Sequence, residues 1–209
     1  MSVSLEEPKN DWVVGVDPGL TGAVAIVTPR NIQGVWDMPV ETWVRERQKT
    51  VDAYALHSII RPFAHRIRIA CVETQQVMTG VESRNTCFSI GESFGMVLGV
   101  MASFEIPMCF VRPAVWKPSL GLSRDKKESI VKAKEYFPDG AEYFTRVKDH
   151  NRAEAALIAF LGLRVPVLNT ATNRRSTVNV EHRGPNKGSY RRGLNRKEGY
   201  KSQVSDNSK

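Results

Sequence analysis

Four acidic residues and one histidine lie where their side chains could do chemistry. Asp17 directly follows the apolar run 12–16, and Glu73 directly follows the apolar run 67–72. A carboxylate at the end of a buried strand is costly unless it meets a cation or a hydrogen-bond donor. The remaining candidates lie at or just inside the start of the last expected helix and are Asp149, His150 and Glu154.

The four carboxylates would form one site if the fold brought them together. Converging carboxylates repel one another and raise each other's pKa unless a divalent cation lies between them. Ligand sets made only of oxygen favour Mg²⁺ or Mn²⁺. Two such ions about 4 Å apart stabilise both the attacking and the leaving oxygen in phosphodiester hydrolysis. The combination therefore predicts a metal-dependent site.

Each acidic residue also has a purely structural explanation. Asp17 precedes Pro-Gly and could simply form a turn. Glu73 could be an exposed strand end, Asp149 a helix cap, and Glu154 a solvated charge on a helix. The metal-site hypothesis rests on their combination.

His150 leaves two arrangements open for the fourth ligand. His150 and Glu154 are four residues apart and share one face of a helix, whereas Asp149 and Glu154 are five apart and diverge. Either Asp149 lies in the preceding loop and turns inward, or His150 takes the fourth position. Histidine can bind a metal or hold a water as general base, although a lone histidine is more often structural.

Apolar periodicity predicts an α/β fold, with a mixed five-stranded sheet flanked by helices. The expected strands are 12–16, 22–28, 34–38, 67–72 and 106–111, and the expected helices are 52–65, 83–104, 123–137 and 149–163. Residues 113–121 are expected to form a loop. Three glycines share one face of the second helix, which indicates close approach by the sheet or by a second subunit; they are Gly91, Gly95 and Gly99.

The positive charge is concentrated near the C-terminus. The 209 residues include 30 Lys and Arg against 22 Asp and Glu, but residues 173–209 hold ten of the basic residues and three of the acidic ones. A basic tail indicates a polyanion partner, usually nucleic acid, although it could merely aid solubility. We expect a flexible N-terminus at 1–11, one domain at 12–170 and a disordered tail at 171–209.

The three cysteines include no CxxC pair, which favours a reducing compartment. The N-terminus has no apolar run typical of a signal peptide, and the longest apolar stretch is short for a bilayer. We expect a cytoplasmic protein with no membrane partner.

Five blocks of sequence resemble the RuvC-type Holliday junction resolvases in order and spacing, especially the phage, bacterial and plastid branch with a Trp-Lys and an RAEA motif. They are VGVDPGLTGAVAI (14–26), ACVETQQVMTG (70–80), FSIGESFGMVLGVM (88–101), VRPAVWKPSLGLSRDKKES (111–129) and DHNRAEAALIAFLG (149–162). The likeness covers about residues 13–163 and excludes the basic tail.

The resemblance implies an RNase H-like fold, a homodimer, Mg²⁺ or Mn²⁺, and symmetric nicks across a four-way DNA junction. Asp17 and Glu73 match the carboxylates that end the first and fourth strands, and Glu154 matches the last acidic residue. The family most often has two Asp three residues apart in the last motif. Here Asn151 stands at the first of these positions, although some relatives use a His in this region.

Two groups of residues are candidates for DNA contacts. One lies around the Trp-Lys motif and the start of the following helix, where lysines suit phosphates and a tryptophan could stack or pack: Trp116, Lys117, Arg124, Lys126 and Lys127. The other follows Glu73 and contains Arg84 and Asn85. Solvated helix charges and a core tryptophan are the structural alternatives.

Three other functions remain open. An actin-like ATPase also has Asp-x-Gly after a strand, but needs a second domain and a second Gly-rich loop that this chain does not show. A non-catalytic junction-binding relative would keep the fold and lose the chemistry. Another nuclease of the same fold, such as a ribonuclease H, transposase or flap nuclease, would keep the carboxylates.

Overall fold

The computed structural model describes residues 11–43, 48–75, 83–123 and 125–165. The predicted tail at 171–209 and all but the last residue of the predicted N-terminal segment lie outside these ranges. The strands are β1 (Trp12–Asp17), β2 (Ala23–Val27), β3 (Ile32–Asp37), β4 (Val40–Trp43), β5 (Gln48–Val51), β6 (Ile67–Glu73) and β7 (Met108–Val111). The α-helices are α1 (Ala53–Ile60), α2 (Arg84–Ser103), α3 (Pro113–Ser119), α4 (Lys126–Tyr136) and α5 (His150–Gly162), and the 3₁₀ turns are η1 (Ala64–Arg66), η2 (Pro138–Phe144) and η3 (Val147–Asp149).

The main sheet has five strands in the order β3-β2-β1-β6-β7. The strands β1, β2 and β3 are antiparallel neighbours, whereas β6 runs parallel to β1 and to β7. The predicted mixed five-stranded sheet is therefore confirmed. In the parallel pair Val16 lies opposite Val72, so the next residue of each strand, Asp17 and Glu73, emerges at the same edge of the sheet.

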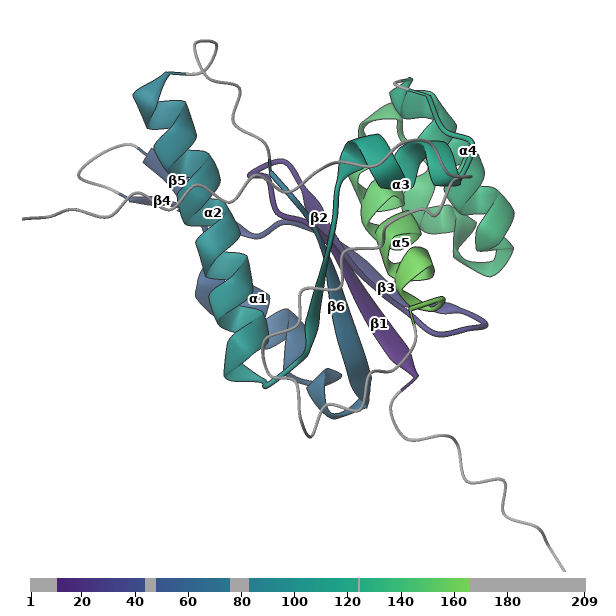
Figure 1. Cartoon of the computed structure of the whole chain (residues 1–209), viewed down its shortest axis with the longest axis horizontal. Coiled ribbons are helices and arrows are strands. Elements are labelled where there is room, and N and C mark those ends of the chain that lie inside the picture. The colour runs from purple at the N-terminus through teal and green to yellow at the C-terminus, as the bar shows by residue number, and fades with distance from the viewer. Residues whose placement is uncertain (1–10, 44–47, 76–82, 124, 166–209) are drawn as a thin grey trace, which may run out of the picture.

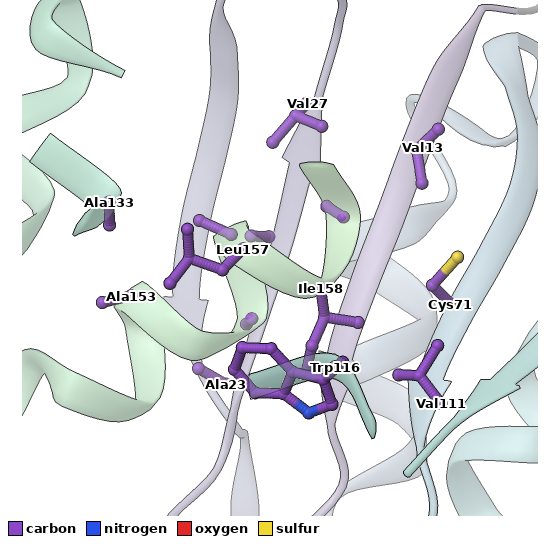
Figure 2. Packing of buried hydrophobic residues seen from close by; sticks show 14 of the residues in the cluster. Val13, Ala23, Val27, Cys71, Val111, Trp116, Ala133, Ala153, Leu157 and Ile158 are labelled. Atoms are coloured by element: carbon purple, nitrogen blue, oxygen red, sulfur yellow. The ribbon is translucent and has the colours of Figure 1, made fainter. Parts of the chain in front are cut away.

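Helices cover both faces of this sheet, and Figure 1 shows α1 and α2 on one side with α3, α4 and α5 on the other. All five residues of β2 are buried, as expected for a strand covered on both faces. Figure 2 shows Leu157 and Ile158 of α5 among Trp116 and Ala23, members of one buried cluster. The packing fixes α5 across β1.

Gly15 permits the close contact between β1 and α5. A Cβ at this position would lie 2.1 Å from the carbonyl oxygen of Ala155 and 2.4 Å from the amide nitrogen of Ala159. Because both atoms belong to the helix backbone, neither can move aside. Glycine at position 15 therefore sets how near α5, and the acidic residue it carries, comes to the end of β1.

The structure corrects two expectations about local elements. Residues 113–119 form helix α3 rather than a loop, with Pro113 in the first turn, where its missing N–H costs nothing. Residues 40–51 contain the hairpin β4–β5, which the sequence did not indicate. A smaller difference is that Asp125, not Ser123, caps α4, by accepting a hydrogen bond from the backbone N–H of Lys127.

The glycine face of α2 is open. Apart from the adjoining backbone of α2 itself, no atom of the described residues lies within 4 Å of the position that a Cβ would take at Gly91, Gly95 or Gly99. The expectation that the sheet approaches these glycines is therefore wrong, and a second subunit stays a prediction. By length and composition α2 could also cross a membrane, and 22% of its apolar window is buried; core helices of soluble proteins meet the same criteria.

Candidate metal centre

Three carboxylates from three elements meet at one edge of the sheet. Asp17 ends β1, Glu73 ends β6, and Glu154 lies one turn into α5. Each offers an oxygen, and these oxygens all lie within 4.8 Å of one another. We call this group the acidic cluster. The parallel pairing of β1 with β6 aligns the first two residues, and the packing of α5 on β1 supplies the third.

Burial makes two members of the acidic cluster, Asp17 and Glu73, hard to ionise without a cation. Glu73 and Glu154 are each only 6% exposed. Burial raises the pKa of Glu73 to about 7, although the indole of Trp116 opposes this and the charges of Asp17 and Glu154 add to it. Burial also raises the pKa of Asp17, against a hydrogen bond from the Gly19 N–H. A divalent cation would relieve both penalties.

Helix α3 contributes two neighbouring side chains to the acidic cluster. The indole Nε1 of Trp116 donates to Glu73 Oε1 at 2.9 Å, and Lys117 Nζ donates to Glu154 Oε1 at 2.7 Å. Ser129 of α4 donates to the same Glu154 oxygen at 3.1 Å. These donors hold two of the three carboxylates in place, and they leave other carboxylate oxygens to face a ligand.

Of the two alternatives for Trp116, stacking on DNA and packing in the core, these contacts favour packing. The residue is 2% exposed and lies in the core, so a base cannot reach the face of its ring. The side chain acts instead through Glu73. A quarter of the Lys117 side chain is exposed. Its ammonium lies at the edge of the acidic cluster, so the phosphate contact stays a prediction.

Asp149 is held away from the acidic cluster. Its carboxylate accepts hydrogen bonds from Arg146 Nε at 2.9 Å, Arg146 Nη2 at 2.6 Å and the Arg146 backbone N–H at 2.8 Å. Burial works to raise the pKa of Asp149, but these bonds outweigh it and the pKa is lowered. Asp149 does lie before the helix, as one predicted arrangement required, but it turns to Arg146 instead of joining the other three carboxylates.

His150 lies at the margin of the acidic cluster. It is half-buried, its Nδ1 lies 3.3 Å from the carbonyl oxygen of Val147, and its charge acts to lower the pKa of Asp17. It is not one of the three converging ligands. The next residue, Asn151, donates from its amide to the carbonyl oxygen of Thr21, so it ties the start of α5 to the turn that follows Asp17.

The remaining predicted DNA contacts lie on the surface. Arg84 and Asn85 are exposed in the first turn of α2, and Lys126 and Lys127 are exposed at the start of α4. Arg124 lies outside the described residues. Their role in binding DNA stays a prediction.

Sequence reasoning missed the arginine pairs beside the acidic cluster. Arg152 binds Asp37 through Nε at 2.6 Å and Nη2 at 2.7 Å. The motif RAEA contains this arginine, but its partner lies 115 residues away and nothing in the spacing indicated it. Ser129, which donates to Glu154 across 25 residues, carried no local signal either.

The acidic cluster fits a hard divalent cation. Its donors are carboxylate oxygens, the ligands that Mg²⁺ and Mn²⁺ prefer, and two of the three residues are buried. The ammonium of Lys117 is the one cation that the described residues bring into hydrogen-bond contact with it. Three carboxylates against one ammonium leave the negative charge that a divalent ion would neutralise.

Comparisons with known proteins identify the fold. No family model and no curated protein matches the chain. The Thermus thermophilus RuvC structure in complex with a Holliday junction substrate matches with a TM-score of 0.54 at 18% identity, covering 73% of this chain and 95% of that one. A second structure of Thermus thermophilus RuvC gives 0.52 at 19% identity with the same coverage. The yeast mitochondrial Holliday junction resolvase gives 0.47 at 16% identity, covering 77% and 80%. The expected resemblance is confirmed at the level of structure, and the chain has the RuvC-type RNase H-like fold.

Proposed function

We propose that this protein is a metal-dependent endodeoxyribonuclease that resolves four-way DNA junctions by symmetric nicking. The observation that carries the proposal is the convergence of Asp17, Glu73 and Glu154 within 4.8 Å, at the strand ends of this fold. A structural neighbour solved with a Holliday junction substrate supports the choice of DNA. Two of the blocks that resemble resolvases bear on the acidic cluster directly: the RAEA motif contains Glu154, and the Trp-Lys motif supplies the donors to Glu73 and Glu154.

The protein's own residues would hold the reacting groups in place. Asp17, Glu73 and Glu154 would bind Mg²⁺ or Mn²⁺, which supplies the Lewis acidity that stabilises the attacking and leaving oxygens. Trp116 orients Glu73 through its 2.9 Å hydrogen bond. Lys117, whose ammonium lies at the edge of the acidic cluster, would donate to a phosphate oxygen of the substrate.

His150 is the candidate for a proton-transferring role. It lies close enough to Asp17 to influence its pKa, and a neutral imidazole can accept a proton from an attacking water. Asn151 would keep the turn after Asp17 in register through its bond to Thr21. Asp149, which is bonded to Arg146, would then have a structural role.

Symmetric nicking needs two centres, and α2 is the candidate surface for a homodimer. Within the part of the chain that the structure describes, its three glycines have no neighbour from another element, and Phe88 at its start is 64% exposed. Small residues four apart let two helices approach closely, and exposed apolar surface on one helix favours burial against a copy. Gly95→Leu should block this packing, and light scattering would then report a monomer where the unmodified protein gives a dimer.

Cleavage of matched substrates tests the nuclease proposal. Labelled four-way junctions, duplex of the same sequence and RNA–DNA hybrid would be incubated with Mg²⁺, Mn²⁺ or chelator. Paired symmetric nicks on the junction that require metal support a resolvase. Tight junction binding without nicking under either metal would instead identify a non-catalytic relative, and cleavage of the hybrid would identify a ribonuclease H.

A further inference from the structure

An open cavity of about 600 Å³ lies beside the acidic cluster. Its walls come from the turn after β1, the hairpin strand β5 and the first three turns of α2. Pro18 and Gly19, which directly follow Asp17, form part of the rim. The cavity is within the size range of small-ligand sites, and a strand with a phosphate at the acidic cluster would pass its mouth.

The cavity is lined by both polar and apolar groups, a combination that suits a planar heterocycle. Leu20 and Ile90 supply apolar surface. Amides and hydroxyls supply donors and acceptors, and they belong to Thr21, Gln75, Asn85, Thr86, Ser89 and Ser93. Flipped bases are bound in this manner, by hydrogen bonds to the base edge and by contact of the base face with apolar side chains.

Ser93 provides an independent sign that a ligand is missing. Its residue is 2% exposed, it lines the cavity, and its hydroxyl has no hydrogen-bond partner within the described residues. A buried hydroxyl without a partner is costly. A ligand that entered the cavity would supply the missing partner.

The charge of the cavity favours a nucleic-acid ligand. Of the lining residues that the structure describes, only Lys49 is charged, and its side chain is exposed at the mouth. A single cation at the mouth and neutral groups inside fit a phosphate outside and an uncharged base within. A small dicarboxylate or a free metal ion would need more charge in the interior.

We propose that this cavity binds one unstacked nucleobase of the DNA strand whose phosphate lies at the acidic cluster. The inference rests on the proposed function, because it assigns a base-binding site to the same substrate. Asn85 and Ser93 lie about 12 Å apart along α2, so they contact opposite ends of the base, and Lys49 contacts the neighbouring phosphate. A centre that holds one base in this way cuts some sequences faster than others, because the amide and hydroxyls fit some base edges better.

A fluorescent base analogue tests this site without any cleavage. 2-Aminopurine would be placed in turn at each position around the crossover of a four-way junction, and the protein added in chelator. We expect fluorescence to rise about threefold at one position next to the crossover, because an unstacked base is no longer quenched. The combined variant Asn85→Ala with Ser93→Ala should lose this rise and bind the junction about tenfold more weakly.

Two control variants separate the base site from general effects. Ser103→Ala removes a hydroxyl from the far end of α2, where it donates to the carbonyl of Val100, and Arg30→Gln removes an exposed charge from the β2–β3 turn. Both should keep the fluorescence rise. Ser93→Ala removes a hydroxyl that has no partner among the described residues, so it should not endanger folding.

The outcomes distinguish this inference from the nuclease proposal. A bound junction with no brightened position, or brightening that survives in the combined variant, overturns the base site even if the junction is nicked. If the 2-aminopurine fluorescence rises with the unmodified protein and with both control variants but not with the combined variant, the base site is supported. This holds even if neither metal produces nicks. In that last case the nuclease proposal fails and the base site stands.

Discussion

Two groups of acidic side chains lie at the same edge of the sheet in opposite electrostatic surroundings. Asp17 and Asp37 are on one rung of the sheet, both opposite Ala23 of β2. In the acidic cluster, burial raises the pKa of Asp17 and Glu73. Beside it, arginines lower the pKa of Asp37 and Asp149.

The difference teaches which carboxylates are able to serve as ligands. Asp37 and Asp149 each meet an arginine in a two-pronged contact, so their charge is already neutralised. The acidic cluster has one ammonium for three carboxylates. Both groups lie near strand ends, but Asp37 and Asp149 already have arginine partners, whereas the three converging carboxylates share one ammonium and could therefore hold a metal ion.

The largest effect is expected from neutralising the acidic cluster. Asp17→Asn should reduce junction cleavage at least about a thousandfold, because it removes a ligand and negative charge where the cation binds. Junction binding in chelator should stay within about threefold, since few of its contacts involve this carboxylate. Single-turnover cleavage and gel-shift measurements check both values. Cleavage at the unmodified rate would disprove the assignment of Asp17.

Removing an arginine partner from Asp37 or Asp149 should lower the stability of the fold. Arg146→Ala leaves the buried carboxylate of Asp149 without its main partner, and we expect a loss of about 2 kcal/mol in the free energy of unfolding. Urea denaturation in chelator measures it. Asp17→Asn is the matched comparison and should be neutral or stabilising, because it removes a charge that burial disfavours. An equal loss of unfolding free energy in Arg146→Ala and Asp17→Asn would show that the acidic cluster and the arginine-paired carboxylates do not differ in this way.

The stability of the metal-free protein should depend on pH through Glu73. Its folded pKa of about 7 exceeds its ordinary value of 4.5, so the folded state binds more protons than the unfolded state between these values. Stability should therefore rise as pH falls from about 8 to about 5, by about 2 kcal/mol. Asp149 has a lowered pKa, so its contribution changes only under more acidic conditions.

Denaturation of the unmodified protein and of Glu73→Gln at pH 5.5 and 8.5, both in chelator, tests this dependence. The variant should lose most of the difference between the two pH values. An identical difference in the variant would assign the effect to other groups. Adding Mn²⁺ should stabilise the unmodified protein more at pH 8.5 than at pH 5.5, because the ion competes with protons for the carboxylates.

A smaller effect is expected from Trp116→Phe. This change keeps the buried ring and removes the donor to Glu73, so the pKa of Glu73 should rise further. We expect a cleavage rate about tenfold lower at pH 7, with the rise of the pH–rate profile displaced to higher pH. A uniform loss at every pH would indicate that the ring only fills space.

The sequence was sufficient to find the acidic cluster because its members follow local rules. Asp17 and Glu73 directly follow apolar runs that form parallel neighbours, and Glu154 lies on the helix face that packs against them. Each of these signals lies within a few residues of the side chain concerned. The sheet itself was predictable for the same reason.

The features that sequence reasoning missed depend on contacts between distant residues or on short elements. Trp116 was offered as a DNA contact because it lies beside Lys117 and other basic residues, whereas its hydrogen bond to Glu73, 43 residues away, had no signal in the local sequence. Two prolines in 113–119 indicated a loop, yet a helix forms because one proline occupies its first turn and Trp116 anchors it in the core. The strands β4 and β5 have four residues each. This is too short for an alternation of polar and apolar residues to predict a strand.

Mn²⁺ binding to the unmodified protein, Asp17→Asn and Asp149→Asn tests the central claim most directly. Calorimetry at pH 8, at a temperature where all three proteins are folded, would measure affinity independently of cleavage. We expect Asp17→Asn to weaken Mn²⁺ binding at least about tenfold, because a ligand is lost, and Asp149→Asn to keep it within about threefold. Metal binding that survives Asp17→Asn and is lost in Asp149→Asn would contradict the account.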